Sequence, residues 1–377
     1  MKFNRPIKLA GLSAIPLRAE GGVSPKMALG SMPTRPALLI RLQDTSGCYG
    51  WGEVWANFPP RANIHKAHIL EDVIASHLNN LTFVDPREVN EVLRSKLSIY
   101  FLHIGQQQVF EHILAGLDIA LWDLSLRSAG VPFVDFLGLK SKVGNTYATS
   151  INATDLEKFI PKHAKMGQTF FKLKIGFEEH GTKEIVQKAT VLCPVGSRIM
   201  VDSNQSWSLN EATTHLRDLE QYNLVFAEEP LRADANFCEW EQLVSSTNVP
   251  IAAGENIYGE HAFLRMADLG VQYLQPDVAK WGGISAILDL VKKIPDEVKV
   301  WPHFMGTAVG QFAALSISAA IGESSYCEVD VNENPLRTQL CVQPIKIQNG
   351  SIALPQSPGL VPEPLKQSLS FLNEKVA

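Results

Sequence analysis

This 377-residue sequence lacks the patterns that identify many binding and secreted proteins. Its five cysteines, at positions 48, 193, 238, 327 and 341, form no CxxC pair, so neither a disulfide framework nor a thiolate metal site is indicated. It has no dense run of Lys or Arg, and its net charge of −5 gives no reason to expect a nucleic-acid partner. No apolar run reaches the length of a membrane span, so we expect no membrane partner either.

Several catalytic motifs are also missing. The sequence contains no P-loop and no GxSxG, which removes phosphate-cradle and serine-hydrolase functions. It has no HxH or HExxH, and no GxGxxG follows the first strand-like run of its repeating part. The N-terminal residues alternate as a strand does, with Pro16 interrupting the apolar stretch, which fits a signal peptide poorly. We therefore expect a cytoplasmic enzyme.

What the sequence does contain is a rhythm of short apolar or β-branched runs separated by helix-like stretches. The runs are NTYATS, FFKLK, SRIMVD, LVFAE, VPIAAGE, VQYLQPD, VKVWPH and SYCEV. Eight strands alternating with helices predict an α/β fold with a parallel (β/α) barrel. An open doubly wound sheet is the alternative, but it usually has fewer strands.

From the second run onward, each run ends in ionisable residues. These are Lys172 and Lys174, then Asp202, Glu228, Glu255, Asp277, His303 and Glu328. In a (β/α) barrel the carboxyl ends of the strands converge on the face where catalysis occurs. Any one of these residues could instead cap a helix or lie on the surface. Their repetition at successive strand ends predicts an active site.

Three of these strand ends carry carboxylates that predict a metal site. Asp202, Glu228 and Glu255 offer oxygen ligands only, with no nitrogen or sulfur. Such a set favours a hard divalent ion that keeps room for water and substrate, so we expect Mg²⁺. Zinc would require His or Cys ligands.

Bases are expected on both sides of this metal. Lys172 and Lys174 lie at i and i+2 of a strand, so both face the same side. Mutual repulsion and a neighbouring cation predict a lowered pKa for Lys174, which would then be a neutral base near pH 7. His303 lies opposite, with Asp277 available to fix its tautomer. Two bases beside a metal suit the removal of a proton α to a carboxylate, because the enediolate product needs charge stabilisation.

These motifs carry a family resemblance that runs in order over nearly the whole chain. They are KLK (172–174), VDSNQSW (201–207), AEEPL (227–231), GEN (254–256), PDVAKWGG (276–283) and PHF (302–304), together with AGLDIALWDL from residue 115. The sequence resembles the enolase superfamily, mandelate racemase subgroup, in which Lys or His bases act with Mg²⁺. The resemblance implies a (β/α)7β barrel at 136–335. An α+β capping domain at 1–135 would be completed by a C-terminal segment at 336–377.

The resemblance also implies roles for individual residues. It assigns the metal to Asp202, Glu228 and Glu255. It assigns base roles to Lys174 and His303, support of the histidine to Asp277, contact with the substrate carboxylate to Lys172, and enediolate hydrogen bonding to Glu328. Asn204 matches a polar substrate-binding position. Asp330 competes with Glu328 for the last position, because it lies at i+2 on the same strand.

The resemblance favours dehydration of a sugar acid to a 2-keto-3-deoxy acid by a homo-oligomeric enzyme with a small-molecule carboxylate substrate. A racemase or epimerase of a hydroxy or amino acid derivative is the alternative, and a non-catalytic anion-binding barrel is a remote one. Substrate choice is expected to lie in the loops at 17–34 and 55–60. There Met32, Trp55 and Phe58 would either line an apolar pocket or only pack the loops.

Overall fold

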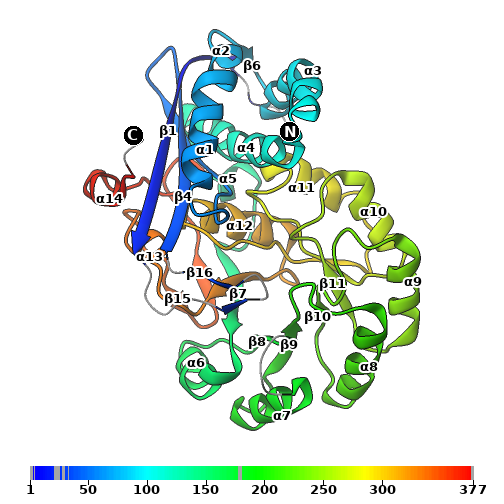
Figure 1. The fold of residues 1–377 in the computed structure, drawn as a ribbon. Helices are drawn as coiled ribbons and strands as arrows, with labels where there is room; N and C mark the ends of the chain where they lie inside the picture. Colours follow the sequence, from blue (N-terminus) through cyan, green and yellow to red (C-terminus); the bar gives the residue numbers. More distant parts are fainter. Residues whose placement is uncertain are drawn as a thin grey trace.

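The computed structural model describes all residues except 1–2, 4, 21–25, 28–29, 33, 177–180 and 375–377. The described chain forms a barrel with a capping domain packed over one side (Figure 1). The predicted loop at 17–34, including Gly21 and Gly22, lies partly outside the described residues.

The barrel contains eight parallel strands in the ladder order β14-β7-β8-β9-β10-β11-β12-β13. The strands are β7 (Val143–Ile151), β8 (Phe170–Lys174), β9 (Arg198–Asp202), β10 (Ala227–Glu228), β11 (Ile251–Ala253), β12 (Tyr273–Leu274), β13 (Lys299–Val300) and β14 (Cys327–Asp330). The intervening helices are α6 (Leu156–Ala164), α7 (Thr182–Leu192), α8 (Leu209–Leu219), α9 (Phe237–Ser246), α10 (Glu260–Asp268), α11 (Gly283–Val291) and α12 (Ala308–Ile321). Short 3-10 turns are η2 (Ala153–Asp155) and η3 (Glu220–Tyr222). Seven helices between eight strands confirm the predicted (β/α)7β barrel.

The capping domain is built on an antiparallel sheet with the order β5-β4-β1-β6. Its strands are β1 (Ile7–Glu20), β4 (Thr34–Asp44), β5 (Tyr49–Val54) and β6 (Thr82–Phe83). Between β1 and β4 in the sequence, β2 (Lys26–Met27) and β3 (Gly30–Ser31) form a separate two-stranded sheet. Its helical segments are α1 (Ala62–Ile69), the π-helical turn η1 (Leu70–Ile74), α2 (Ala75–Leu78), α3 (Pro86–His103), α4 (Gln107–Ala129) and α5 (Phe133–Phe136). Helix α4 ends where Gly130 takes the left-handed conformation, with φ of 72°, a geometry that glycine adopts without strain. Pro132 follows two residues later, and a glycine followed by a proline is the usual sequence signal for the end of a helix.

The last part of the chain returns to the first. The strands β15 (Ile347–Gln348) and β16 (Ser351–Ala353) form a hairpin, and β16 pairs antiparallel with β7. The short helix α13 (Pro335–Thr338) precedes them, and α14 (Lys366–Leu372) follows and lies beside β1 (Figure 1). The N–H of Glu374 donates to the carbonyl oxygen of Pro16 at 2.9 Å, which ties the C-terminal segment to the capping sheet.

Buried carboxylates of the capping domain cap two helices of the barrel. Glu53 on β5 accepts hydrogen bonds from the backbone of Thr307 and Gly310, both at 2.9 Å, at the start of α12. Asp118 on α4 accepts from the backbone N–H groups of Ile284 and Ser285, at 2.7 and 2.8 Å, in the first turn of α11. Free N–H groups at a helix start need such partners, so these bonds fix the capping domain on the barrel.

Within the described ranges, no helix combines the length and apolar character needed to cross a membrane.

Candidate active site

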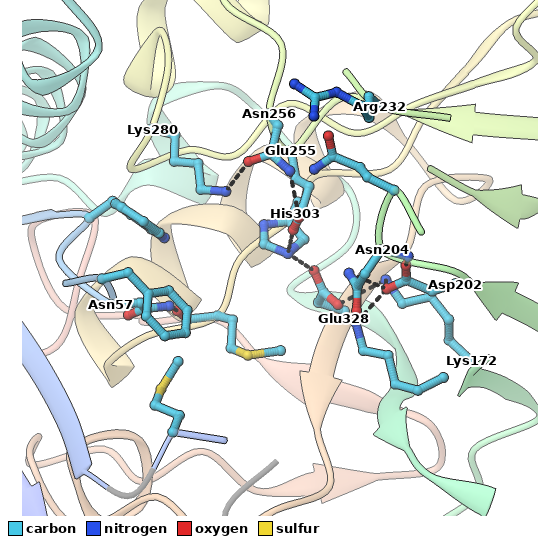
Figure 2. Close-up of a pocket in the computed structure, with 16 residues that line it drawn as sticks. Asn57, Lys172, Asp202, Asn204, Arg232, Glu255, Asn256, Lys280, His303 and Glu328 are labelled. Atoms are coloured by element: carbon cyan, nitrogen blue, oxygen red, sulfur yellow. Dashed lines mark hydrogen bonds and ion pairs between the residues drawn. The ribbon is translucent and has the colours of Figure 1, made fainter. Parts of the chain in front are cut away.

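A cavity of about 460 Å³ opens at the carboxyl ends of the barrel strands. Its inner end is formed by charged and polar residues that the sequence predicts: Lys172, Lys174, Asp202, Asn204, Glu255, His303 and Glu328. Its outer end is formed by Met32, Trp55, Asn57, Phe58, Arg232 and Met305, with Gln205, Asn256 and Lys280 on the walls. Figure 2 shows these residues converging from several strands and loops. The predicted loop residues Met32, Trp55 and Phe58 therefore line the cavity.

Both lysines of β8 point into the barrel. The exposed fractions of Lys172 and Lys174 are only 1% and 5%. Lys172 Nζ donates to Glu228 Oε2 at 2.6 Å and lies 3.2 Å from Glu328 Oε2. Lys174 Nζ donates to Asp202 Oδ2 at 2.5 Å and to Asn204 Oδ1 at 2.7 Å. The strand thus buries two ammonium groups on one face, each with carboxylate partners.

These carboxylate partners act against the predicted lowering of the Lys174 pKa. Burial lowers the pKa of Lys174, but the carboxylates of Asp202, Glu228 and Glu255 together outweigh burial and the repulsion from Lys172, so the net pKa is raised. The pKa of Lys172 is likewise raised, because Glu228 and Glu328 outweigh burial. The expected lowering follows from the neighbouring ammonium group and a cation, and the carboxylates across the barrel have the opposite effect.

The predicted metal ligands Asp202 and Glu228 lie at the ends of adjacent strands. Asp202 and Glu228 are direct partners in the parallel pairing of β9 with β10. Gln275 Nε2 also donates to Glu228 Oε2, at 2.7 Å. Burial raises the pKa of Glu228 to about 7, although Lys172 opposes the rise. Glu228 therefore lies where a negative charge is costly without a cation nearby.

The third predicted ligand, Glu255, follows β11 by two residues. Asn256 Nδ2 donates to Glu255 Oε1 at 2.8 Å and to both oxygens of Glu229, at 3.0 and 3.1 Å. Lys280 Nζ in turn donates to Asn256 Oδ1 at 3.0 Å (Figure 2). Neither Glu229, Asn256 nor Gln275 was predicted. The paired glutamates of AEEPL and the Asn of GEN were the available signals.

Among the described residues, no three His, Cys, Asp or Glu side chains are arranged as a ready-made metal site. Asp202 and Glu228 instead face lysines, and Glu255 faces His303. The charges nevertheless fit a divalent cation. The carboxylates gathered here are Asp202, Glu228, Glu229, Glu255, Asp277 and Glu328, and the cationic groups beside them are Lys172, Lys174, Lys280 and His303. The carboxylates outnumber the cationic groups by six to four, and Asp202, Glu228 and Glu255 offer only oxygen donors, the kind that Mg²⁺ prefers.

His303 is held by carboxylates on both ring nitrogens. Its Nδ1 lies 2.7 Å from Asp277 Oδ2, and its Nε2 lies 2.6 Å from Glu255 Oε2 and 3.1 Å from Glu328 Oε1. Burial lowers the pKa of His303, but Glu328, Glu255 and Asp277 together raise it well above the ordinary value. The geometry leaves Nε2 as the nitrogen that faces the cavity.

The two carboxylates of β14 point to different partners. Glu328 lines the cavity, between Lys172 and His303. Asp330 instead binds Arg35 of the capping sheet, with Arg35 Nη2 donating to Asp330 Oδ2 at 3.0 Å. Of the two candidates for the last site position, Glu328 is the one in the cavity.

Two family models match the chain. The model described as "Enolase C-terminal domain-like" matches residues 156–367. The model described as "Mandelate racemase / muconate lactonizing enzyme, N-terminal domain" matches residues 18–138.

Individual relatives match over most of their length. An arabinonate dehydratase of Saccharolobus solfataricus is 28% identical over 350 residues, covering 89% of this chain and 90% of its own. A D-galactarolactone cycloisomerase of Agrobacterium fabrum is 25% identical over 344 residues, covering 86% and 88%. The crystal structure of a mandelate racemase/muconate lactonizing enzyme from Bordetella bronchiseptica RB50 superimposes with a TM-score of 0.89 at 32% identity. That alignment covers 98% of this chain and all of the other.

Proposed function

Since this chain belongs to the enolase superfamily, in its mandelate racemase subgroup, we propose that it dehydrates a sugar acid to a 2-keto-3-deoxy acid. Its reaction begins with removal of the proton α to the substrate carboxylate. Arabinonate and galactonate dehydratases are among its full-length relatives, which supports a hydro-lyase acting on a small carboxylate.

Mg²⁺ is the cofactor, and Asp202, Glu228 and Glu255 are the residues that would hold it. When bound, Mg²⁺ supplies the positive charge that the substrate carboxylate needs as electron density moves onto it. Lys172 and Lys174 now contact carboxylate oxygens of Glu228 and Asp202, which would hold the metal. With those oxygens occupied, Lys172 would contact the substrate oxygens and Lys174 would face the α-proton.

The observation that carries the proposal is the placement of His303 against Lys174. Asp277 holds His303 Nδ1, which leaves Nε2 toward the cavity, while Lys174 enters from β8 on another part of the barrel. One of the pair can take the α-proton. A protonated His303 can give a proton to the departing β-hydroxyl, whose loss with the C–O electron pair yields an enol that ketonises. Glu328 and Lys172 would hydrogen-bond the developing enediolate, and Asn204 would bind the substrate beside Lys174.

A panel of aldonic and aldaric acids, incubated with the enzyme and Mg²⁺, tests the proposal. We expect a 2-keto acid, detected as its semicarbazone, from at least one sugar acid. The His303→Asn variant should lose this product, whereas His103→Asn, a change at an exposed residue of α3, should retain it. If no sugar acid gives a keto product while a hydroxy or amino acid is inverted at Cα, the enzyme is a racemase or epimerase.

That second function has a specific basis. Bases that reach the cavity from separate strands can take a proton from one face of the α-carbon and return it to the other.

We also propose that the enzyme is cytoplasmic and assembles from identical subunits, as expected from the sequence.

A further inference from the structure

A second group of buried polar side chains lies behind the outer wall of the cavity. Lys66 of α1 is only 2% exposed, and among the described residues no carboxylate forms an ion pair with it. Its ammonium group instead donates to the carbonyl oxygen of Trp55 at 2.5 Å and to His112 Nδ1 of α4 at 2.9 Å. Burying an ammonium group without an anion is costly, so the position calls for an explanation beyond packing.

The contacts of Lys66 hold Trp55 from several sides. The carbonyl of Trp55 accepts from Lys66, and its N–H donates to the carbonyl of Ala279 in the barrel at 3.3 Å. Lys66 Nζ lies 4.8 Å from the centre of the indole ring, and Lys280 Nζ lies 4.9 Å from it. Both distances are within the range of cation–π attraction. Trp55 is therefore fixed at its backbone and at its ring.

The ammonium group of Lys66 determines which atoms of this group donate and which accept hydrogen bonds. An ammonium group has no acceptor, so His112 Nδ1 must accept from Lys66 and His112 Nε2 must carry the proton. That N–H donates to Tyr258 Oη at 2.9 Å, in the loop after β11. The chain from Lys66 to Tyr258 thus joins the capping domain to a loop of the barrel next to Glu255.

We propose that Lys66 is a positioning residue that fixes Trp55 as the specificity-determining wall of the cavity, against which the substrate packs beyond its α-carbon. The inference rests on the proposed function only in requiring that a carboxylic acid be turned over in this cavity. Trp55 and Lys280 both line that cavity, whereas Lys66 does not. Lys66 therefore acts through Trp55, and its loss should weaken substrate binding more than it slows the chemistry.

The charge of Lys66 gives the proposal a pH signature. Burial, with a smaller contribution from Lys280, lowers the pKa of Lys66 to about 7. The titratable groups that face it are His112 from α4 and Lys280 from the loop after β12, with Tyr258 behind His112. Burial also holds the pKa of His112 well below its usual value, so that ring stays neutral. The ammonium form that fixes Trp55 is complete well below pH 7 and is lost as the pH rises through about 7, so KM should rise over that range.

The test compares Lys66→Met with the wild type, because methionine keeps an unbranched chain of similar length without charge. We expect KM to rise about tenfold, equivalent to about 1.4 kcal/mol of binding, with kcat within twofold. The rise of KM above pH 7 should be absent in the variant. Lys158→Met is the matched control: Lys158 also lies over an aromatic ring, that of Phe159 at 4.6 Å, but on an exposed part of α6, so its kinetics should be unchanged.

The measurements use whichever acid the enzyme turns over, so failure of the dehydration proposal leaves this test intact. If Lys66→Met does not fold, Tyr258→Phe decides, because it removes only the hydroxyl that accepts from His112. We expect a smaller rise in KM with unchanged kcat and an unchanged thermal midpoint. A fall in kcat without a change in KM, or the same pH dependence of KM in wild type and Lys66→Met, overturns the proposal.

Discussion

The protonation of each charged residue in this cavity depends on the charged groups that it contacts. Lys172 and Lys174 stay protonated because Lys172 contacts Glu228 of β10 and Lys174 contacts Asp202 of the neighbouring β9. A cation bound to those same carboxylates would compete for the oxygens that the lysines now hold. The basicity of Lys174 is thus set by what Asp202 binds, which a reading of β8 alone cannot reveal.

The two candidate bases can be separated by hydrogen exchange. With substrate in D₂O, we expect Lys174→Ala or His303→Asn to slow exchange of the α-proton by about 10²- to 10⁴-fold, whichever residue faces that proton, since that is the usual contribution of a positioned base. Mass spectrometry of recovered substrate measures the rate. Lys183→Ala, at an exposed position of α7, is the control. Wild-type exchange rates in both active-site variants would refute the assignment.

The predicted site residues were accessible from sequence because each ends a strand in a repeated unit. Glu229 and Asn256 lie in the motifs AEEPL and GEN, but their roles and that of Gln275 depend on side chains that meet only after the barrel closes. Asn256 bridges Glu229, Glu255 and Lys280 through hydrogen bonds that no sequence spacing encodes. Lys66 was equally hidden, because its partners belong to two other elements.

Among the elements, α12 depends on a residue from another domain. Glu53 accepts from the backbone N–H groups of Thr307 and Gly310 and from the Thr307 hydroxyl. We expect Glu53→Gln to lower the free energy of unfolding by about 2 kcal/mol, because an amide nitrogen would face backbone donors in a buried place. Urea denaturation followed by circular dichroism measures the change.

The control for that variant is a cap within one helix. Glu211 completes the capping box of α8 with Ser208, and both residues are exposed or nearly so. Glu211→Gln should therefore cost no more than about 0.5 kcal/mol. Equal losses in the two variants would show that the bond between the domains adds nothing.

Helices and strands could be predicted where the local sequence pattern and the packing in the fold favour the same structure. The eight barrel strands and the stop of α4 at Gly130 follow from local signals. The segment HKAHILEDVIASHL at 65–78 has the pattern of one amphipathic helix, yet it contains the π-helical turn η1. The turn lies against β1 and buries Leu70 and Ile74, a tertiary contact that the periodicity of an isolated helix does not contain.

The whole molecule should respond to Mg²⁺ through its stability. Unbalanced carboxylates in the barrel destabilise the folded state, and a cation that binds only this state stabilises it. At 100 times its Kd, Mg²⁺ should raise the free energy of unfolding by about 2.7 kcal/mol. Thermal denaturation at increasing Mg²⁺ measures this, and EDTA should remove both the stabilisation and the activity.

Two variants sharpen that measurement. Glu228→Gln should fold but show little stabilisation by Mg²⁺, because one charged ligand is gone. Glu241→Gln, at an exposed position of α9, should behave as the wild type. Full activity after exhaustive chelation, with a thermal midpoint indifferent to Mg²⁺, would contradict the metal assignment.

The caps supplied by the first domain also bear on how the chain is made on the ribosome. Asp118 precedes its partner Ile284 by 166 residues, and Glu53 precedes Thr307 by 254. Because synthesis proceeds from the N-terminus, both carboxylates have left the ribosome long before α11 and α12 emerge. The carboxylates of the capping domain are thus already present when the helices that they cap are synthesised. A permuted gene that encodes the capping domain last would release those helices with their first turns unpartnered.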